Sequence, residues 1–313
     1  MTNSISKNLV FIDGITRCGK SLFSGIIPSF ENMEHIQFHN QLELIIPTAG
    51  LGAIDLNFAK KILNLSLTEL AYNLQLSRNV NFRGEDQTGI YNYKDPDVYI
   101  NRLSLNEGDE IIEFILSNNI HIPFQTHDLM VNLDVLNCMD LDYKMIELLR
   151  NPIDNLYSWW IKGLGERFSN DIREFTLPVE YKGFSFPWYC HGYEEEVIDL
   201  NPYERCIKIG INLIERSIDQ YKNSKNKDKI IIILFEDMVQ NPNYQLNRIE
   251  DFLGLQTTKY TNKFISEAKC PRVLNPKDRN DKLSIFKENV SPDLFENLVS
   301  LTNSYEKDTY GLV

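Results

Sequence analysis

The sequence predicts an α/β fold, a doubly wound and mostly parallel sheet with helical insertions. Three short apolar runs, at residues 9–12, 144–149 and 229–235, predict strands of this sheet. The last run, KIIIILF, does not alternate with polar residues, so we expect it to be a central parallel strand. Segments with apolar residues at helical spacing separate these runs, and such alternation of strands and helices is typical of parallel sheets.

The remaining elements follow from periodicity and from residues that begin or end helices. We expect further strands at 35–39 and 122–127, and two segments of surface excursion or insertion at 77–96 and 163–200. The segment 269–287 is basic, and we expect it to be irregular. No repeat and no long linker divides the chain, so a single domain over 1–313 is predicted, with insertions near 48–120 and 163–225. Helices are expected at about 20–28, 55–76, 106–117, 152–164, 202–221, 244–253 and 291–305.

The composition excludes several classes of partner. The 313 residues include 42% hydrophobic and 24% charged residues, and the formal net charge is -12. Such an acidic chain is a poor match for nucleic acid or an anionic membrane surface. Its five cysteines are scattered without a C-x-x-C pair, which favours reduced thiols and a cytoplasmic protein. We expect no signal peptide and no transmembrane segment; the sequence does not indicate the oligomeric state.

A glycine-rich loop follows the first apolar run. Gly14, Gly19, Lys20 and Ser21 give the spacing G-x-x-x-x-G-K-S of a complete P-loop. Such a loop turns its backbone N–H groups towards one point at a helix N-terminus, where they bind a phosphate or a similar oxyanion. Arg17 and Lys20 add full positive charges. The loop therefore predicts phosphate binding, without specifying the group that is transferred.

A second anion site is predicted at IELLRNPIDNLYSWW, residues 146–160. A strand ends at Arg150, a helix begins at Pro152, and Ser158 lies two turns into that helix. Arg150 and Ser158 can both reach one anion at the strand end.

Together these motifs resemble the family of sulfotransferases that use 3′-phosphoadenosine 5′-phosphosulfate (PAPS). The loop TRCGKSL resembles the family's R-S-G-T-S-L form but has Lys20 in place of threonine. The stretch at 233–255 resembles the family's Y-E-D-L segment and is expected to be structural. The resemblance implies a PAPS site in which the loop holds the 5′-phosphosulfate and the second motif the 3′-phosphate. The implied cofactor-binding residues are Arg17, Cys18, Gly19, Lys20, Ser21, Leu22, Arg150 and Ser158.

The resemblance also implies that residues 269–287 close over the 3′-phosphate. The family's R-K-G triplet is absent there, and Arg272 and Arg279 are the candidates for this contact. No metal is expected, because sulfuryl transfer needs none and the histidines lack ligand spacing.

Two residues are candidates for the base that deprotonates the acceptor. His127, in IPFQTHDL, matches the histidine of the family's K-T-H-L stretch, and imidazole titrates near neutral pH. Gln125 stands in place of the lysine there, so Lys20 is the candidate for the missing charge. Glu43 is the alternative base, because other sulfotransferases use a glutamate soon after the first helix; His39 is a weaker variant of the same idea.

We expect the acceptor to be a hydroxyl (or amine) of a carbohydrate, glycolipid or small molecule, and the two insertions to form its pocket. Aromatic residues are expected to line this pocket or to stack on adenine: Trp159, Trp160, Phe186, Trp188 and Tyr189. One alternative is a P-loop kinase that uses ATP, with Glu236 and Asp237 as magnesium ligands. Another is an inactive relative that only binds the nucleotide.

Overall fold

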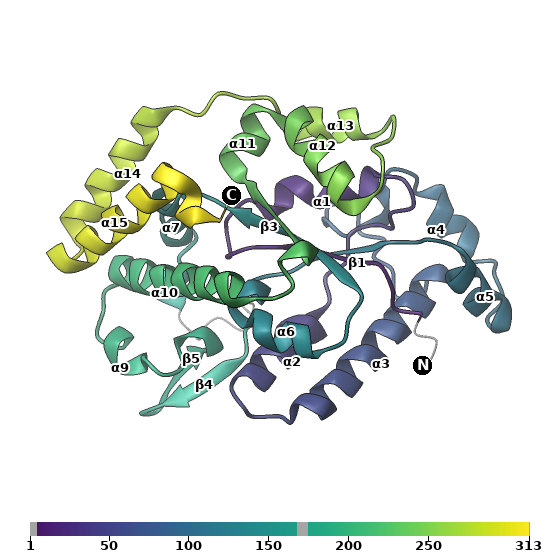
Figure 1. Ribbon diagram of the computed structural model, residues 1–313, viewed down its shortest axis with the longest axis horizontal. Coiled ribbons are helices and arrows are strands. Elements are labelled where there is room, and N and C mark those ends of the chain that lie inside the picture. Colours follow the sequence, from purple (N-terminus) through teal and green to yellow (C-terminus); the bar gives the residue numbers. More distant parts are fainter. Residues whose placement is uncertain (1–4, 168–174, 313) are drawn as a thin grey trace.

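A parallel four-stranded sheet forms the centre of the computed structural model, which describes residues 5–167 and 175–312 (Figure 1). The strands lie in the order β2-β1-β3-β6, and each neighbouring pair is parallel. Their carboxyl ends therefore meet at one edge of the sheet, where sites form in such folds. The strands are β1 (Leu9–Asp13), β2 (Ile122–Gln125), β3 (Tyr143–Leu149) and β6 (Ile230–Leu234).

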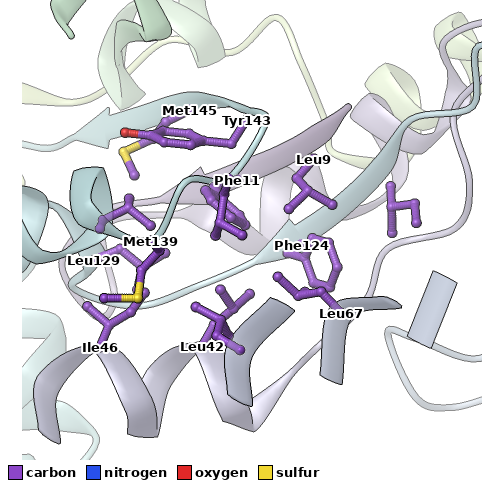
Figure 2. Packing of buried hydrophobic residues seen from close by; sticks show 14 of the residues in the cluster. Leu9, Phe11, Leu42, Ile46, Leu67, Phe124, Leu129, Met139, Tyr143 and Met145 are labelled. Carbon is purple, nitrogen blue, oxygen red and sulfur yellow. The ribbon is translucent and has the colours of Figure 1, made fainter. Parts of the chain in front are cut away.

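Helices cover both faces of the sheet, which confirms the doubly wound α/β class. Alternate side chains of β1 enter different cores, Leu9 and Phe11 on one face and Val10 and Ile12 on the other. The first face is covered by α2 (Asn40–Gly50), α3 (Leu56–Gln75) and α6 (Leu133–Cys138). Figure 2 shows side chains of the strands meeting those of these helices. The second face is covered by α1 (Phe23–Ile26), α11 (Phe235–Gln240), α12 (Pro242–Leu253) and α13 (Thr261–Glu267).

A third core surrounds the long helix α10 (Pro202–Asn223), which packs against α7 (Pro152–Ile161) and α15 (Pro292–Asp308). The helix α14 (Pro276–Asn289) lies beside α15 (Figure 1). The remaining helices are α4 (Asp97–Arg102), α5 (Asp109–Ser117), α8 (Leu164–Arg167) and α9 (Glu194–Val197), and β4 (Pro178–Tyr181) and β5 (Phe184–Pro187) form a hairpin. Short 3₁₀ helices span Lys20–Leu22, Ile27–Ser29, Ile90–Asn92, Leu129–Asn132, Trp188–Cys190, Lys227–Lys229 and Thr309–Gly311.

Two predictions about strands are wrong. Residues 35–39 form no strand, because this segment pairs with β2 only at an isolated bridge between Gln37 and Phe124 before α2 begins. The strand β6 lies at an edge of the sheet, although we expected it to be central. Its apolar run is explained by burial on both faces, since Ile232 belongs to the third core and Ile233 to the second. An apolar run thus indicates that both faces of a strand are buried, but it does not indicate whether the strand is central or at an edge of the sheet.

Two predictions about helices also need correction. The expected helix at 20–28 is split into α1 and two flanking 3₁₀ helices. The segment 269–287 is largely helical, because Asn275 caps α14 and Pro276 occupies its first turn. Charged residues on several sides of α14 conceal its periodicity. Among the described residues, no helix combines the length and apolar character needed to cross a bilayer.

Candidate active site

The glycines of the loop at residues 14–19 adopt backbone conformations that other residues rarely reach. Gly14 has φ +136° and Gly19 has φ +114°. A Cβ atom at Gly14 would lie 2.5 Å from the carbonyl oxygen of Leu148, and one at Gly19 would lie 2.4 Å from the ring of Phe235. The loop therefore sits directly on β3 and on the start of α11, and its spacing of glycines is a steric requirement.

Lys20 lies beneath this loop. Its side chain is buried, and Nζ donates to the carbonyl oxygens of Gly14 and Ile15, at 3.2 Å from the latter. Burial lowers the pKa of Lys20, but the acidic groups around it, which include Asp128 and Glu147, raise the pKa by more. The ammonium group therefore stays charged and holds the loop from inside. Its contact with a transferred group stays a prediction.

Three arginines gather around the outer side of the loop. The Nε of Arg17 donates to the Ser158 hydroxyl at 3.1 Å, and Arg150 donates to the carbonyl oxygen of Arg17 at 3.1 Å. The guanidinium groups of Arg150 and Arg272 lie 4.7 and 5.8 Å from the ring centroid of Phe235. Within residues 5–167 and 175–312, none of the three arginines has a carboxylate at ion-pair distance. In a chain of net charge -12, three such arginines indicate a site for an anion.

Arg150 is the most unusual of the three. Burial lowers the pKa of its guanidinium group, and its buried Nε has no hydrogen-bond partner in the described part of the chain. A buried donor without a partner is costly unless a ligand satisfies it. The structure therefore brings Arg17, Arg150 and Ser158 together, as their sequence motifs predict.

Arg279 is placed differently from these arginines. It forms ion pairs with Asp154 at 2.9 Å and with Glu306 at 2.8 Å, and Lys282 also contacts Asp154. These contacts bind α14 to α7 and α15. A phosphate contact by Arg279 stays a prediction, and it would compete with two carboxylates.

The two alternative bases form one hydrogen-bonded pair. Nδ1 of His127 lies 2.8 Å from Oε1 of Glu43, although the two residues are 84 positions apart. Glu43 lies in the first turn of α2, and His127 follows the end of β2. Within the described part of the chain, Nε2 of His127 has no hydrogen-bond partner. The pair has the arrangement of a general base and the carboxylate that orients it.

A cleft of about 340 Å³ opens beside this pair and reaches the loop at Thr16. Trp159, Trp188 and Tyr189 line it, as expected for an acceptor pocket, whereas Trp160 and Phe186 do not. The insertion at 163–225 therefore contributes directly to the lining. The other lining residues are Phe38, His39, Asn40, Glu43, Gln125, His127, Asp128, Leu164, Arg167, Phe175, Thr176 and Pro187.

The sequence reasoning missed Asp128 and Gln87. Asp128 is buried beside His127, and its carboxylate accepts from the backbone N–H of Thr16 at 3.3 Å. Burial raises the pKa of this carboxyl group to about 6. Its position directly after His127 could have identified it. No local signal identifies Gln87, which donates to Gln125 at 2.8 Å from a distant loop.

Glu236, one of the two magnesium ligands that the kinase alternative names, is already engaged. The Glu236 carboxylate accepts from the backbone N–H of Asn151 at 3.0 Å and from the hydroxyl of Tyr305 at 2.6 Å. One of its oxygens therefore supports the turn after β3, and the other ties α15 to the start of α11. Among the described residues, no three His, Cys, Asp or Glu side chains are grouped as metal ligands.

Comparison with known proteins agrees with these motifs. Residues 10–270 match the family model described as a sulfotransferase domain. A search of curated protein sequences gives no match.

Solved structures similar to this chain include a sulfotransferase from Alicyclobacillus acidocaldarius. It is 16% identical over 95% of this chain and 96% of that one, with a TM-score of 0.39. The sulfotransferase domain of the Synechococcus PCC 7002 olefin synthase is 16% identical over 97% of this chain and 96% of that one, with a TM-score of 0.46. The sulfotransferase domain from the curacin biosynthetic pathway is 12% identical over 94% and 96%, with a TM-score of 0.47. These TM-scores are below 0.5, so the assignment depends on the family model alone. Because that match spans more than half of the 313 residues, the chain belongs to the sulfotransferase family.

Proposed function

We propose that this chain is a PAPS-dependent sulfotransferase that transfers a sulfuryl group to a hydroxyl (or amine) of a carbohydrate, glycolipid or small-molecule acceptor. One observation carries the proposal. The pair of His127 and Glu43 opens into a cleft that reaches the glycine loop, and the other side of that loop has three arginines that form no ion pair with any described residue. The site thus combines a base, space for an acceptor and positive charge for a donor with two anionic ends.

The residues present fit the donor. The close packing of Gly14 on β3 and of Gly19 on Phe235 fixes the loop, and the backbone N–H groups of such a loop suit an oxyanion. Arg150, with its unsatisfied Nε, and Ser158 suit the 3′-phosphate, while Arg17 lies between the two anion positions. PAPS supplies the activated sulfuryl group. The arginines orient it and balance the charge that develops on the leaving phosphate.

The pair of His127 and Glu43 prepares the acceptor. Because Nδ1–H of His127 donates a hydrogen bond to the carboxylate of Glu43, the imidazole presents the lone pair of Nε2 to the cleft. Nε2 takes the hydroxyl proton as the acceptor oxygen attacks sulfur, and Glu43 stabilises the imidazolium that results. Trp159, Trp188 and Tyr189 provide apolar walls that exclude water from the reacting groups.

Binding of the nucleotide product tests this function. We expect 3′-phosphoadenosine 5′-phosphate (PAP) to raise the melting temperature of the purified chain without Mg²⁺, and ATP with Mg²⁺ to have a much smaller effect. No shift with millimolar PAP would refute the proposal, and a preference for ATP with Mg²⁺ would favour the kinase alternative. The inactive alternative predicts that PAP binds but that Glu43→Gln and His127→Asn leave the rate of PAPS consumption unchanged.

The five cysteines are all free thiols, which favours a reducing compartment. We therefore propose a cytoplasmic site for this reaction.

A further inference from the structure

Gln125 stands at the carboxyl edge of the sheet, at the position of the lysine in the K-T-H-L stretch that IPFQTHDL resembles. It is the last residue of β2, pairs in register with Ile12 of β1, and lies two positions before His127. Its side chain is buried, yet it lines the cleft. Lys20 does not replace the missing charge on this side, because its ammonium group faces the carbonyl oxygens beneath the loop.

The amide of Gln125 has a defined orientation. Its Oε1 accepts a hydrogen bond of 2.8 Å from Nε2 of Gln87. The NH₂ group is therefore the end that remains for the cleft, and no described residue accepts from it. Gln87 also lines a second pocket of about 320 Å³, which Ser21 and Leu22 at the end of the glycine loop line as well. The pair of glutamines thus stands between the donor loop and the acceptor cleft.

The loop that carries Gln87 is fixed by its own hydrogen bonds. The side chain of Asn81 donates to Asp86 at 2.9 Å and to Thr88 at 3.0 Å, on either side of Gln87. The carbonyl oxygen of Gly89 accepts from the buried His35 at 2.9 Å, which ties the loop to the segment before α2. A Cβ atom at Gly89 would lie 2.1 Å from the carbonyl oxygen of Arg83, so the loop closes tightly on itself. The polar segment 77–96, which the sequence predicts to be an excursion on the surface, therefore fixes the position of Gln87.

We propose that Gln125 contacts the acceptor as a neutral hydrogen-bond donor, and that Gln87 is the positioning residue that turns its NH₂ group into the cleft. The inference rests on the proposed sulfuryl transfer. The NH₂ group donates to the acceptor hydroxyl and directs the hydroxyl proton towards Nε2 of His127. In this step the acceptor O–H bond breaks, the proton moves to Nε2, the O–S bond forms, and the S–O bond to the donor phosphate breaks.

The absence of charge on Gln125 has a consequence for the substrate class. A lysine at this position stabilises an anionic oxygen and so favours acidic hydroxyls such as phenols. An amide stabilises an anionic oxygen less than an ammonium group does, so deprotonation depends more on the pair of His127 and Glu43. The site therefore suits neutral alcohols, including sugar hydroxyls.

Four variants test this assignment: Gln125→Leu, Gln87→Leu, Gln87→Glu and Gln125→Lys. The control is Gln240→Leu, because Gln240 is an exposed glutamine at the end of α11. Release of PAP from PAPS is measured with water, methyl β-D-glucopyranoside or 4-nitrophenol as the acceptor, and the Kd for PAP is measured separately. Gln125→Leu should lower kcat/KM about 10- to 100-fold, and Gln87→Leu less, with the Kd for PAP within about threefold of wild type.

Gln87→Glu and Gln125→Lys change which groups donate and accept hydrogen bonds at these two positions. They therefore distinguish a role of the glutamines in orienting the acceptor from a purely structural role. A carboxylate at position 87 accepts from the NH₂ group of Gln125 and turns its carbonyl oxygen into the cleft, so Gln87→Glu should be slower than Gln87→Leu. Gln125→Lys should raise the ratio of kcat/KM for 4-nitrophenol over the glucoside by about tenfold.

Equal rates for Gln125→Leu, Gln87→Leu and Gln240→Leu in an active enzyme would overturn the inference and leave the proposed function intact. Failure of the wild-type protein to bind PAP would overturn both.

Discussion

Replacement of Arg150 by alanine should change binding and stability in opposite directions. In the described structure the guanidinium group has no carboxylate at ion-pair distance, and burial lowers its pKa, although the charges of Asp154 and Glu236 offset part of this effect. Its favourable contacts are the bond to the carbonyl oxygen of Arg17 at 3.1 Å and the ring of Phe235 at 4.7 Å. These contacts offset the desolvation of a buried charge only partly. We expect Arg150→Ala to leave the free energy of unfolding without ligand unchanged or slightly higher.

The cost to binding should be large. A guanidinium group that meets a phosphate through two charge-assisted hydrogen bonds contributes about 3–4 kcal/mol, which corresponds to a rise in Kd of roughly 10²- to 10³-fold. Arg150→Lys keeps the charge but not the two-pronged geometry, so its Kd should lie between those of wild type and the alanine variant.

Titration calorimetry with PAP gives the affinities, and thermal unfolding without ligand gives the stabilities. Arg78→Ala is the matched control, because Arg78 is an exposed arginine whose ion pair with Glu107 lies on the surface. The reasoning would be refuted if Arg150→Ala bound PAP within about threefold of wild type. It would also be refuted if the variant lost more than about 2 kcal/mol of stability without ligand, because the role of Arg150 would then be structural.

Three further exchanges address the base, the loop and the pH dependence of stability. His127→Asn should lower kcat by about 10²- to 10⁴-fold at unchanged Kd for PAP, measured as steady-state PAP release; a small effect on kcat would exclude a base role. Gly19→Ala should lower the free energy of unfolding by about 2–4 kcal/mol in urea, because its Cβ would lie 2.4 Å from the Phe235 ring and its φ is +114°. The control Gly84→Ala should leave the free energy of unfolding unchanged, because no atom lies within 4 Å of the added Cβ. Burial raises the pKa of Asp128 to about 6, so the folded state binds the proton more tightly than the unfolded state and stability falls as the pH rises from about 4 to about 6. Asp128→Asn should remove this loss and gain about 2–3 kcal/mol over wild type between pH 4 and pH 7, and equal pH profiles in thermal unfolding would contradict the burial argument.

Local motifs were predicted well because neighbouring residues in one short segment determine them. Arg150 and Ser158 lie on one strand–turn–helix unit, so their spacing alone predicts that they lie near each other. The loop at residues 14–19 is similar, since only glycine fits at Gly14 and Gly19. Errors occurred where the decisive contacts are distant. The apolar run of β6 reports its covered faces but not its edge position, and the capped, highly charged α14 lacks a clear apolar stripe.

The sequence by itself therefore determined the fold class, the family and the residues that surround the donor loop. Tertiary structure decided how the catalytic side chains are combined. It joined His127 and Glu43, which the sequence offered only as alternatives, because α2 packs where β2 ends. It turned Lys20 inward towards the carbonyl oxygens of Gly14 and Ile15, and it placed Gln87 against Gln125. These contacts join residues from separate elements, and only the packing of those elements on the sheet fixes the directions of their side chains.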